Sequence, residues 1–366
     1  MQILCRSPIM KMIHLFKRLI PFAFAVFCTF LSCAPEPGYV TISGFAQGGT
    51  YNVKFNMEGI SESPEEIRDS VDSILRRIDH SLSGYNRNSI LSRFNAGEIV
   101  VPDSLFIDIY SQAYVIFENT DGFVDVAAAP LFDIWGFGFK NGEIPSDELV
   151  DQTVVSSGMK RLKTDMSEVL SESGELDPSA VLLDHEADPR LPKLNYNAIA
   201  QGYSCDVVAR YLYSIGVKDM MVDIGEIFCD GVNPSGKRWT IGIDRPVDGN
   251  NEPGADMQGI FRVPDGPHGV VTSGNYRKFY VRDGQKYAHT INPKTGYPVQ
   301  HGLLSATVVA PDAMTADAYA TYCMVVGLEA AIDFIESHTE LEACLIYDEG
   351  GVFRTWCSSG FVLETI

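Results

Sequence analysis

The sequence predicts an α+β fold in a single large domain, on three observations. The chain has 366 residues, enough for a substantial core, and it shows no internal repeat of about 20–50 residues and no long linker. Apolar residues make up 45% and charged residues 21%, which is ordinary for a folded globular protein. Strand-like and helix-like segments are both present but do not alternate strictly, which favours α+β over a doubly wound sheet.

Hydrophobic patterning places the expected elements along the chain. Short runs rich in β-branched and aromatic residues predict strands at TYNVKF (50–55), AVLLDH (180–185), RWTIGI (238–243), KFYVRD (278–283), SATVVA (305–310) and ACLIYDE (343–349). Helical periodicity predicts helices over 64–82, 104–120, 197–216 and 315–338, the last interrupted at Gly327.

Residues 1–32 are typical of a lipoprotein signal peptide. A basic start with Lys17 and Arg18 leads into an apolar run too short for a convincing stop-transfer helix, and the run ends just before Cys33. Residues 33–40 then resemble a tether, and 41–366 form the folded domain. We therefore expect lipidation of Cys33, an extracytoplasmic (periplasmic) location and a lipid anchor in a membrane. An ordinary cleaved signal peptide or a membrane anchor is the alternative.

The chain is strongly acidic, with a formal net charge of −20 at pH 7. It contains no basic stripe with interleaved aromatic residues, so nucleic acid is not an expected partner. An anionic substrate would need local neutralisation in such a protein, and a divalent cation is the simplest means.

Five cysteines follow the amino-terminal region: Cys205, Cys229, Cys323, Cys344 and Cys357. They form no C-x-x-C motif and have no histidine at zinc-ligand spacing, so we expect small buried side chains. Two of them, Cys344 and Cys357, fall in consecutive strand-like segments, which leaves a pairing between them open.

The segment PDAMTADAYATYC (311–323) carries the sharpest chemical signal. Thr315 is the expected N-cap, and Asp317 and Thr321 stand four residues apart on one face of the first turns. A carboxylate and a hydroxyl are hard oxygen ligands, suited to magnesium or calcium rather than zinc. The alternative is an acidic first turn that the helix dipole stabilises.

A second helix start, LNYNAIAQGYSCDVVARYL (194–212), places Asn195 and Asn197 before small residues such as Ala198 and Gly202. Polar caps that lead into small residues let backbone groups contact a ligand directly. An amphipathic core helix with a good cap is the plainer interpretation.

Three further stretches combine turn residues with aromatic residues: SLSGYNRNSILSRFNAG (81–97), DGFVDVAAAPLFDIWGFG (121–138) and GVVTSGNYRKFY (269–280). Each alone is typical of a turn beside a core aromatic residue. A flat aromatic ligand would need walls of this kind.

Taken in order, these motifs and AHTINPKTGYP (288–298) resemble the ApbE family of FAD:protein FMN transferases, from about Gly44 to the carboxyl end. The resemblance implies a single α+β domain of the ApbE-like, T-fold-related type with FAD in a cleft. It implies a Mg²⁺-dependent enzyme that passes the FMN half of FAD to a threonine or serine hydroxyl of another protein and releases AMP. The implied acceptors are subunits of membrane electron-transfer complexes or other extracytoplasmic flavoproteins.

Site residues carry over from the same motifs. The resemblance implies that the metal is held by the backbone carbonyl of Ala198 and by Asp317 and Thr321. The positions at which the family touches FAD are Gln47, Tyr85, Phe123, Val124, Asp125, Asn195, Gln201 and Ile291.

The chain also departs from the family pattern. Gln201 stands where many members have lysine, which leaves more of the phosphate neutralisation to the metal. Asn292 replaces the aspartate of the His-x-x-Asp-Pro motif, and the turn at Gly225 and Glu226 has one glycine fewer than the family's Gly-Gly-Glu.

His289 is the expected catalytic residue. A threonine hydroxyl is a weak nucleophile at neutral pH, and an imidazole held by the following Asn-Pro and Lys-Thr-Gly turns can take its proton. A structural histidine that orders this loop is the alternative. Two other functions remain open: an FAD pyrophosphatase that yields FMN and AMP, and a flavin-binding lipoprotein without catalysis.

Overall fold

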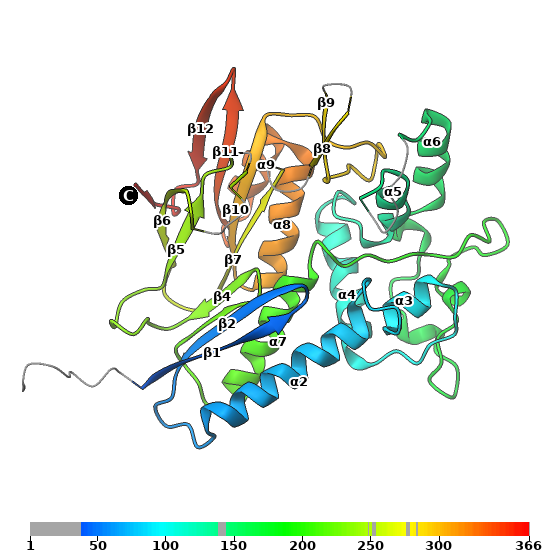
Figure 1. Ribbon diagram of the computed structural model, residues 1–366. Helices are drawn as coiled ribbons and strands as arrows, with labels where there is room; N and C mark the ends of the chain where they lie inside the picture. Colours follow the sequence, from blue (N-terminus) through cyan, green and yellow to red (C-terminus); the bar gives the residue numbers. More distant parts are fainter. Residues whose placement is uncertain are drawn as a thin grey trace, which may run out of the picture. The chain divides into compact units, whose positions relative to one another are not determined.

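The computed structural model describes residues 38–137, 144–247, 249–250, 254–275, 279–282 and 285–365. The unit Val40–Ile366 contains the fold (Figure 1). Cys33 and the expected signal peptide lie outside the described residues, so both stay predictions. Among the helices of the described segments, none is long and apolar enough to cross a membrane.

The main sheet of the described residues has eight strands, and its neighbouring pairs from β2 to β12 are antiparallel. Its order is β1 (Tyr39–Ala46), β2 (Gly49–Asn56), β3 (Met220–Asp223), β4 (Ile227–Asp230), β7 (His268–Gly274), β10 (Leu303–Ala310), β11 (Glu342–Glu349) and β12 (Val352–Cys357). Strands from both ends of the sequence share one sheet, which confirms the α+β single-domain expectation.

Two smaller sheets complete the strand content of the described segments. One joins β13 (Leu363–Glu364), β6 (Met257–Arg262) and β5 (Thr240–Asp244). The other is the hairpin of β8 (Phe279–Arg282) and β9 (Gln285–Ala288), which leads directly to His289.

The longer helices are α2 (Pro64–Leu82), α4 (Ser104–Asn119), α7 (Ala200–Ser214), α8 (Ala313–Val326) and α9 (Leu328–Ser337). Shorter ones are α3 (Ile90–Asn95), α5 (Ala129–Ile134), α6 (Asp147–Ser156) and the 3-10 turns η1 (Val126–Ala128), η2 (Met159–Arg161), η3 (Ser167–Val169) and η4 (Pro178–Val181).

Local chemistry explains why α2 begins where the pattern predicts. Ser63 accepts a hydrogen bond from the backbone of Glu66, and the Glu66 side chain accepts one from the Ser63 backbone, which completes a capping box. A buried stripe then runs along one face of the helix: Ile67, Val71, Leu75, Ile78 and Leu82.

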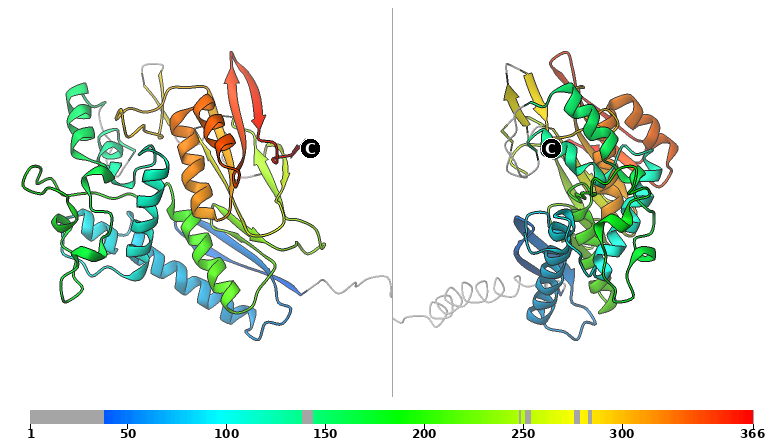
Figure 2. Two further views of the ribbon diagram at one scale, coloured as in Figure 1. Left: turned by 180° about the vertical axis from the view of Figure 1, so that it is seen from behind. Right: turned by 90° about the vertical axis from the view of Figure 1, so that its right-hand side faces the viewer.

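Glycines let α7 and α8 approach each other and the sheet. α7 packs on β3 and β4, and α8 packs on β7 and β10, on the same side of the sheet (Figure 2, left). A Cβ added at Gly269 of β7 would lie 2.4 Å from Ala313 Cα, and one added at Gly202 of α7 would lie 2.3 Å from the Ala313 carbonyl oxygen. The start of α8 is therefore in close contact with both neighbours, which only glycine permits.

Two expectations about elements were wrong. Residues 180–185 form no strand: Asp177 caps the turn at Pro178–Val181, and Leu182 makes only an isolated bridge to Leu162. Val181 and Leu182 are buried in an irregular segment, whereas Leu183 is 61% exposed. The stretch 269–280, expected as turns, begins with the rest of strand β7.

Two helix starts also differ from the expected ones. α7 begins at Ala200 rather than 197, because Asn195 Oδ1 accepts a hydrogen bond from the Asn197 backbone in a turn before the helix. α8 begins at Ala313 with Asp312 as its N-cap, and Thr315, the expected cap, donates its backbone N–H to that carboxylate.

Candidate active site

The crossing of α7 and α8 brings Asp317, one of the expected metal ligands, against the first turn of α7. The backbone N–H of Gly202 donates a hydrogen bond to Asp317 Oδ2 over 3.1 Å. In a continuous helix that N–H would bond the carbonyl of Ala198, one turn earlier, but Ala198 precedes the first residue of α7. Asp317 therefore contacts the first turn of α7, four residues after Ala198, and Thr321 follows Asp317 by one turn on α8.

The chemistry of these groups fits a hard divalent cation. Asp317 is 5% exposed, and burial is the main cause that raises the pKa of its carboxyl group well above the usual range. A buried carboxylate with a backbone N–H as its neighbour is stabilised in the charged form by a cation. With the Thr321 hydroxyl and the Ala198 carbonyl it offers the oxygen ligands that Mg²⁺ prefers. Ala198, Asp317 and Thr321 would hold such an ion.

Asp206 joins the two helices and was missed by the sequence analysis. Its carboxylate accepts hydrogen bonds from the backbone N–H groups of Ala313 and Met314, each over 2.9 Å, and so holds the first turn of α8 on α7. Burial raises the pKa of Asp206 to about 7. The available signal was an acidic residue one turn after Gly202 in a helix that is mainly buried.

Two glutamines reach the first turns of α7 from different directions. Gln47, in the turn between β1 and β2, has a φ of 52° and donates its side-chain amide to Ser204 Oγ. Gln201 donates to the Ile224 carbonyl and lies against Gly225, whose φ of 93° and close contact favour glycine. Both expected FAD positions thus lie at the first turns of α7, the helix whose Gly202 contacts Asp317.

A cavity of about 250 Å³ adjoins the segment before α7. Tyr85, Asn195 and Asn197 line it, and the Asn197 amide donates to the Tyr85 hydroxyl over 3.4 Å. Ligand sites for whole drug-sized molecules usually measure roughly 300–1,000 Å³, so this cavity suits one ring system rather than a dinucleotide. Tyr85 is 71% exposed and presents a face on which a ring could stack.

Phe123 contacts α8 through Tyr322. Its ring centroid lies 6.0 Å from that of Tyr322, the residue after Thr321. Lys294 places its Nζ 3.9 Å from the centre of the Phe123 ring and forms an ion pair with Asp121. A cation therefore stands beside an expected FAD contact, and no local sequence pattern indicates it.

Asp125 and Val124 have structural partners in the same loop. Asp125 accepts hydrogen bonds from the backbone of Ala127 and Met159, and burial raises its pKa to about 6. Val124 is buried and donates its backbone N–H to Thr120.

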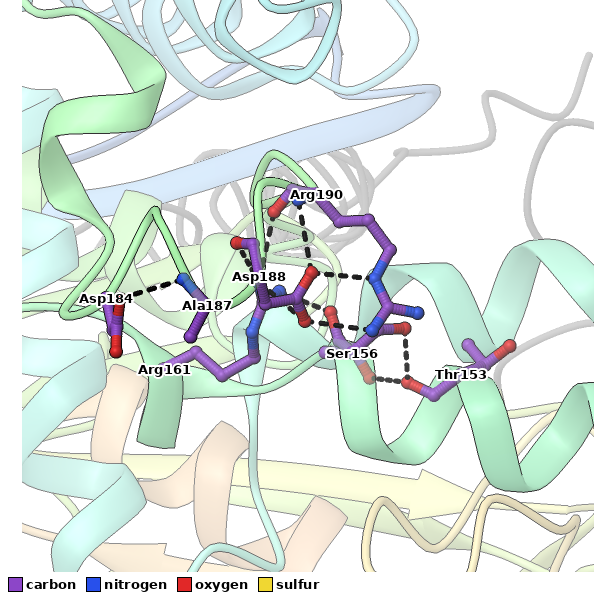
Figure 3. Close-up of polar contacts among 8 residues, drawn as sticks. Thr153, Ser156, Arg161, Asp184, Ala187, Asp188 and Arg190 are labelled. Atoms are coloured by element: carbon purple, nitrogen blue, oxygen red, sulfur yellow. Dashed lines mark hydrogen bonds and ion pairs between the residues drawn. The ribbon is translucent and has the colours of Figure 1, made fainter.

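A polar cluster fixes the segment that leads into Asn195. Asp188 lies 3.1 Å from Arg161 and 2.8 Å from Arg190, and hydrogen bonding to Arg190 is the chief cause that lowers its pKa to about 2 (Figure 3). Arg161 also donates to the Ser156 carbonyl at the end of α6. Asn195 then donates its backbone N–H to the Val126 carbonyl over 2.7 Å, which joins this segment to the Phe123 loop.

The loop that carries His289 is anchored at both ends. Thr290 donates its hydroxyl to Asn275 Oδ1 over 2.7 Å, next to the end of β7. Trp135 Nε1 donates to the Gly296 carbonyl over 2.7 Å, and Ile291 is buried in the same small cluster as Trp135. Ile291 therefore supports this loop from within. His289 is partly buried.

A buried Asp317 at a helix crossing, a cavity beside Tyr85 and an anchored histidine loop together make up the candidate site of this antiparallel α+β domain. The ApbE family profile matches residues 47–345. The FAD:protein FMN transferase of Escherichia coli is 31% identical over 357 residues, which cover 94% of this chain and 96% of that protein. The corresponding protein of Haemophilus influenzae is 30% identical over 347 residues, 93% of this chain and 95% of its own length.

Solved structures agree with the sequence comparison. The apo form of the Pseudomonas stutzeri flavinyl transferase ApbE superposes with a TM-score of 0.73 at 28% identity, over 88% of this chain and 95% of that one. The Vibrio cholerae flavin transferase ApbE gives a TM-score of 0.70 at 29% identity, over 88% and 97%. The chain belongs to the ApbE family. The expected family is thereby confirmed.

Proposed function

We propose that this protein is an FAD:protein FMN transferase, which moves the FMN half of FAD to a threonine or serine hydroxyl of an acceptor protein and releases AMP. The proposal rests on family membership across nearly the whole chain and on the names of its relatives. The structural observation that supports it is the contact of Gly202 with Asp317, which sets a buried carboxylate against α7, next to the expected FAD position Gln201.

The reaction exchanges one bond at phosphorus. The acceptor oxygen forms a bond to the FMN phosphorus, the bond from that phosphorus to the bridging oxygen breaks, and AMP leaves with the electron pair. A Mg²⁺ ion at Ala198, Asp317 and Thr321 would neutralise charge on the diphosphate. We assign to His289 the removal of the proton from the acceptor hydroxyl, which passes to the imidazole as the new bond forms.

The same site could use water as the acceptor, which would make the protein an FAD pyrophosphatase. Binding of flavin without any reaction is the other alternative. The buried acid of Asp317 supports a reaction, because a pocket that only stores flavin has no need of a carboxylate at 5% exposure beside it.

The place of action is part of the proposal. We infer that residues 1–32 direct export, that Cys33 carries the lipid and that the domain acts at an extracytoplasmic membrane surface. Its acceptors would be subunits of membrane-bound electron-transfer complexes or other extracytoplasmic flavoproteins. Metabolic labelling with a fatty-acid analogue, with Cys33→Ala as the control, tests the anchor; equal labelling of both forms would refute it.

One incubation separates the three activities. The protein is mixed with FAD, MgCl₂ and a candidate flavoprotein acceptor, and the products are resolved after denaturation. Flavin fluorescence that stays with the denatured acceptor, with AMP in equal amount, is the expected result. Free FMN with AMP would indicate hydrolysis, and unchanged FAD with every acceptor would refute catalysis. Asp333→Asn, at an exposed site on α9, serves as the neutral variant.

A further inference from the structure

Two cysteines face each other across the last hairpin of the main sheet. Cys344 of β11 is the register partner of Cys357 of β12, and both are free thiols in this structure. Cys344 is 1% exposed, whereas Cys357 is only partly buried. The other three cysteines of the described segments are buried, and Cys229, for example, faces Met221 and His268 rather than another thiol.

The register places this pair at a position that a disulfide can span. Ser358 donates its backbone N–H to the Ala343 carbonyl over 2.9 Å, so the neighbouring pair of Ala343 and Ser358 is a hydrogen-bonded one. Because bonded and non-bonded pairs alternate along an antiparallel ladder, Cys344 and Cys357 form a non-hydrogen-bonded pair. The Cα atoms of such pairs are typically about 4.5 Å apart, within the range of about 4.4–6.8 Å that disulfides require.

The two thiols are chemically unequal. A hydrogen bond joins their side chains, and it is the chief cause that lowers the pKa of Cys357. The same contact, together with burial, raises the pKa of Cys344. Cys357 is therefore the more accessible sulfur and the one more readily ionised, and both properties favour attack on a disulfide from solution.

We propose that Cys344 and Cys357 are a modification site at which a disulfide-bearing oxidant closes a cross-strand disulfide. The Cys357 thiolate attacks one sulfur of the oxidant, which forms a mixed disulfide and releases one thiolate. Cys344 loses its proton and attacks Cys357 Sγ, which releases the second thiolate. The protein loses two protons and two electrons, and the oxidant is reduced to two thiols.

The bond would secure an exposed edge. β12 is the last strand of the sheet, and its first residues, Val352 and Phe353, are 52% and 41% exposed. An edge strand offers unpaired backbone groups and frays or pairs with other chains unless it is held. A covalent link at Cys357 holds the end of β12 to β11 and limits such opening.

The test uses the full chain with oxidised glutathione. The protein is reduced, cleared of reductant, treated with oxidised glutathione under native conditions, alkylated and digested without reduction for mass spectrometry. We expect one linked peptide pair containing Cys344 and Cys357, while Cys205, Cys229 and Cys323 stay unmodified. The oxidised protein should unfold at a temperature roughly 4 °C higher than the reduced protein, as expected for a hairpin-sized loop in a domain of this length.

Two single variants give opposite results if the order of attack is right. Cys344→Ser should accumulate glutathione on Cys357, because the second step is removed. Cys357→Ser should leave Cys344 unmodified, because the buried thiol does not meet the oxidant. The proposal is wrong if native wild-type protein keeps both thiols alkylatable after oxidation, if glutathione stays on Cys357 without resolution, or if either single variant gains the same rise in unfolding temperature.

Discussion

The backbone N–H of Gly202 in α7 lies 3.1 Å from Asp317 Oδ2 in α8 and donates a hydrogen bond to it. This contact joins two motifs that are more than a hundred residues apart in the sequence, and it holds the expected metal ligand Asp317 against the first turn of α7. The sheet and Asp206 support the same arrangement, since both hold the first turn of α8.

Replacing Asp317 with Asn should abolish metal-dependent turnover. The amide keeps an acceptor for Gly202 but removes the charge that a divalent cation requires, so FAD cleavage should fall at least about 100-fold, or about 3 kcal/mol. AMP release measured against MgCl₂ concentration gives the effect. Asp333→Asn should behave as wild type; an Asp317→Asn protein with wild-type turnover would remove this residue from the metal site.

Replacing Gly202 with Ala tests the close approach of the helices. The new methyl group would lie 2.3 Å from the Ala313 carbonyl oxygen, so α7 and α8 must separate. Urea unfolding should show a loss of about 1–3 kcal/mol, and half-saturation should need more MgCl₂. Gly49→Ala is the matched control because a Cβ there meets nothing within 4 Å. Equal stability and equal metal dependence of the two variants would contradict the geometry.

Replacing His289 with Asn should separate binding from transfer. The imidazole is assigned to proton removal, so FAD affinity should change little while transfer slows by about 10²–10⁴-fold. Equilibrium titration of FAD and single-turnover transfer to an acceptor measure the two effects. Unchanged transfer would leave His289 as a loop-ordering residue.

The burial of Asp125 predicts a pH effect on stability. Its pKa is raised to about 6 in the folded protein, above its value in the unfolded chain. Between these pKa values the folded state retains a proton that the unfolded state has lost, so the contribution of Asp125 to stability falls as pH rises through this window. The unfolding temperature of the wild type minus that of Asp125→Asn should therefore be more positive near about pH 4.5 than near about pH 7. A constant difference would exclude this titration.

Periodic segments were the most predictable part of the fold. The limits of α2 agreed with the pattern because a capping box, an apolar stripe and burial all indicate the same helix. The strand expected over residues 180–185 was wrong. Val181 and Leu182 are buried outside any strand, and composition alone does not distinguish such a segment from a strand.

Site residues that lie within one sequence motif could be predicted. Site residues that depend on contacts between distant segments could not. The spacing of Asp317 and Thr321 is visible in one helix, so these two residues could be proposed from the sequence. Asp206 and Lys294 depend on contacts between distant segments, with Met314 and with Phe123, which no local pattern indicates. Asp312 was overlooked as the cap of α8 because Thr315 is an equally good cap type three residues later.

The most direct test of the central claim is transfer of flavin to an acceptor in MgCl₂, with and without a chelator. The account predicts covalent flavin on the acceptor and equal release of AMP, both lost with excess chelator and restored by added Mg²⁺. Undiminished transfer in the chelator would contradict the placement of a metal at Ala198, Asp317 and Thr321.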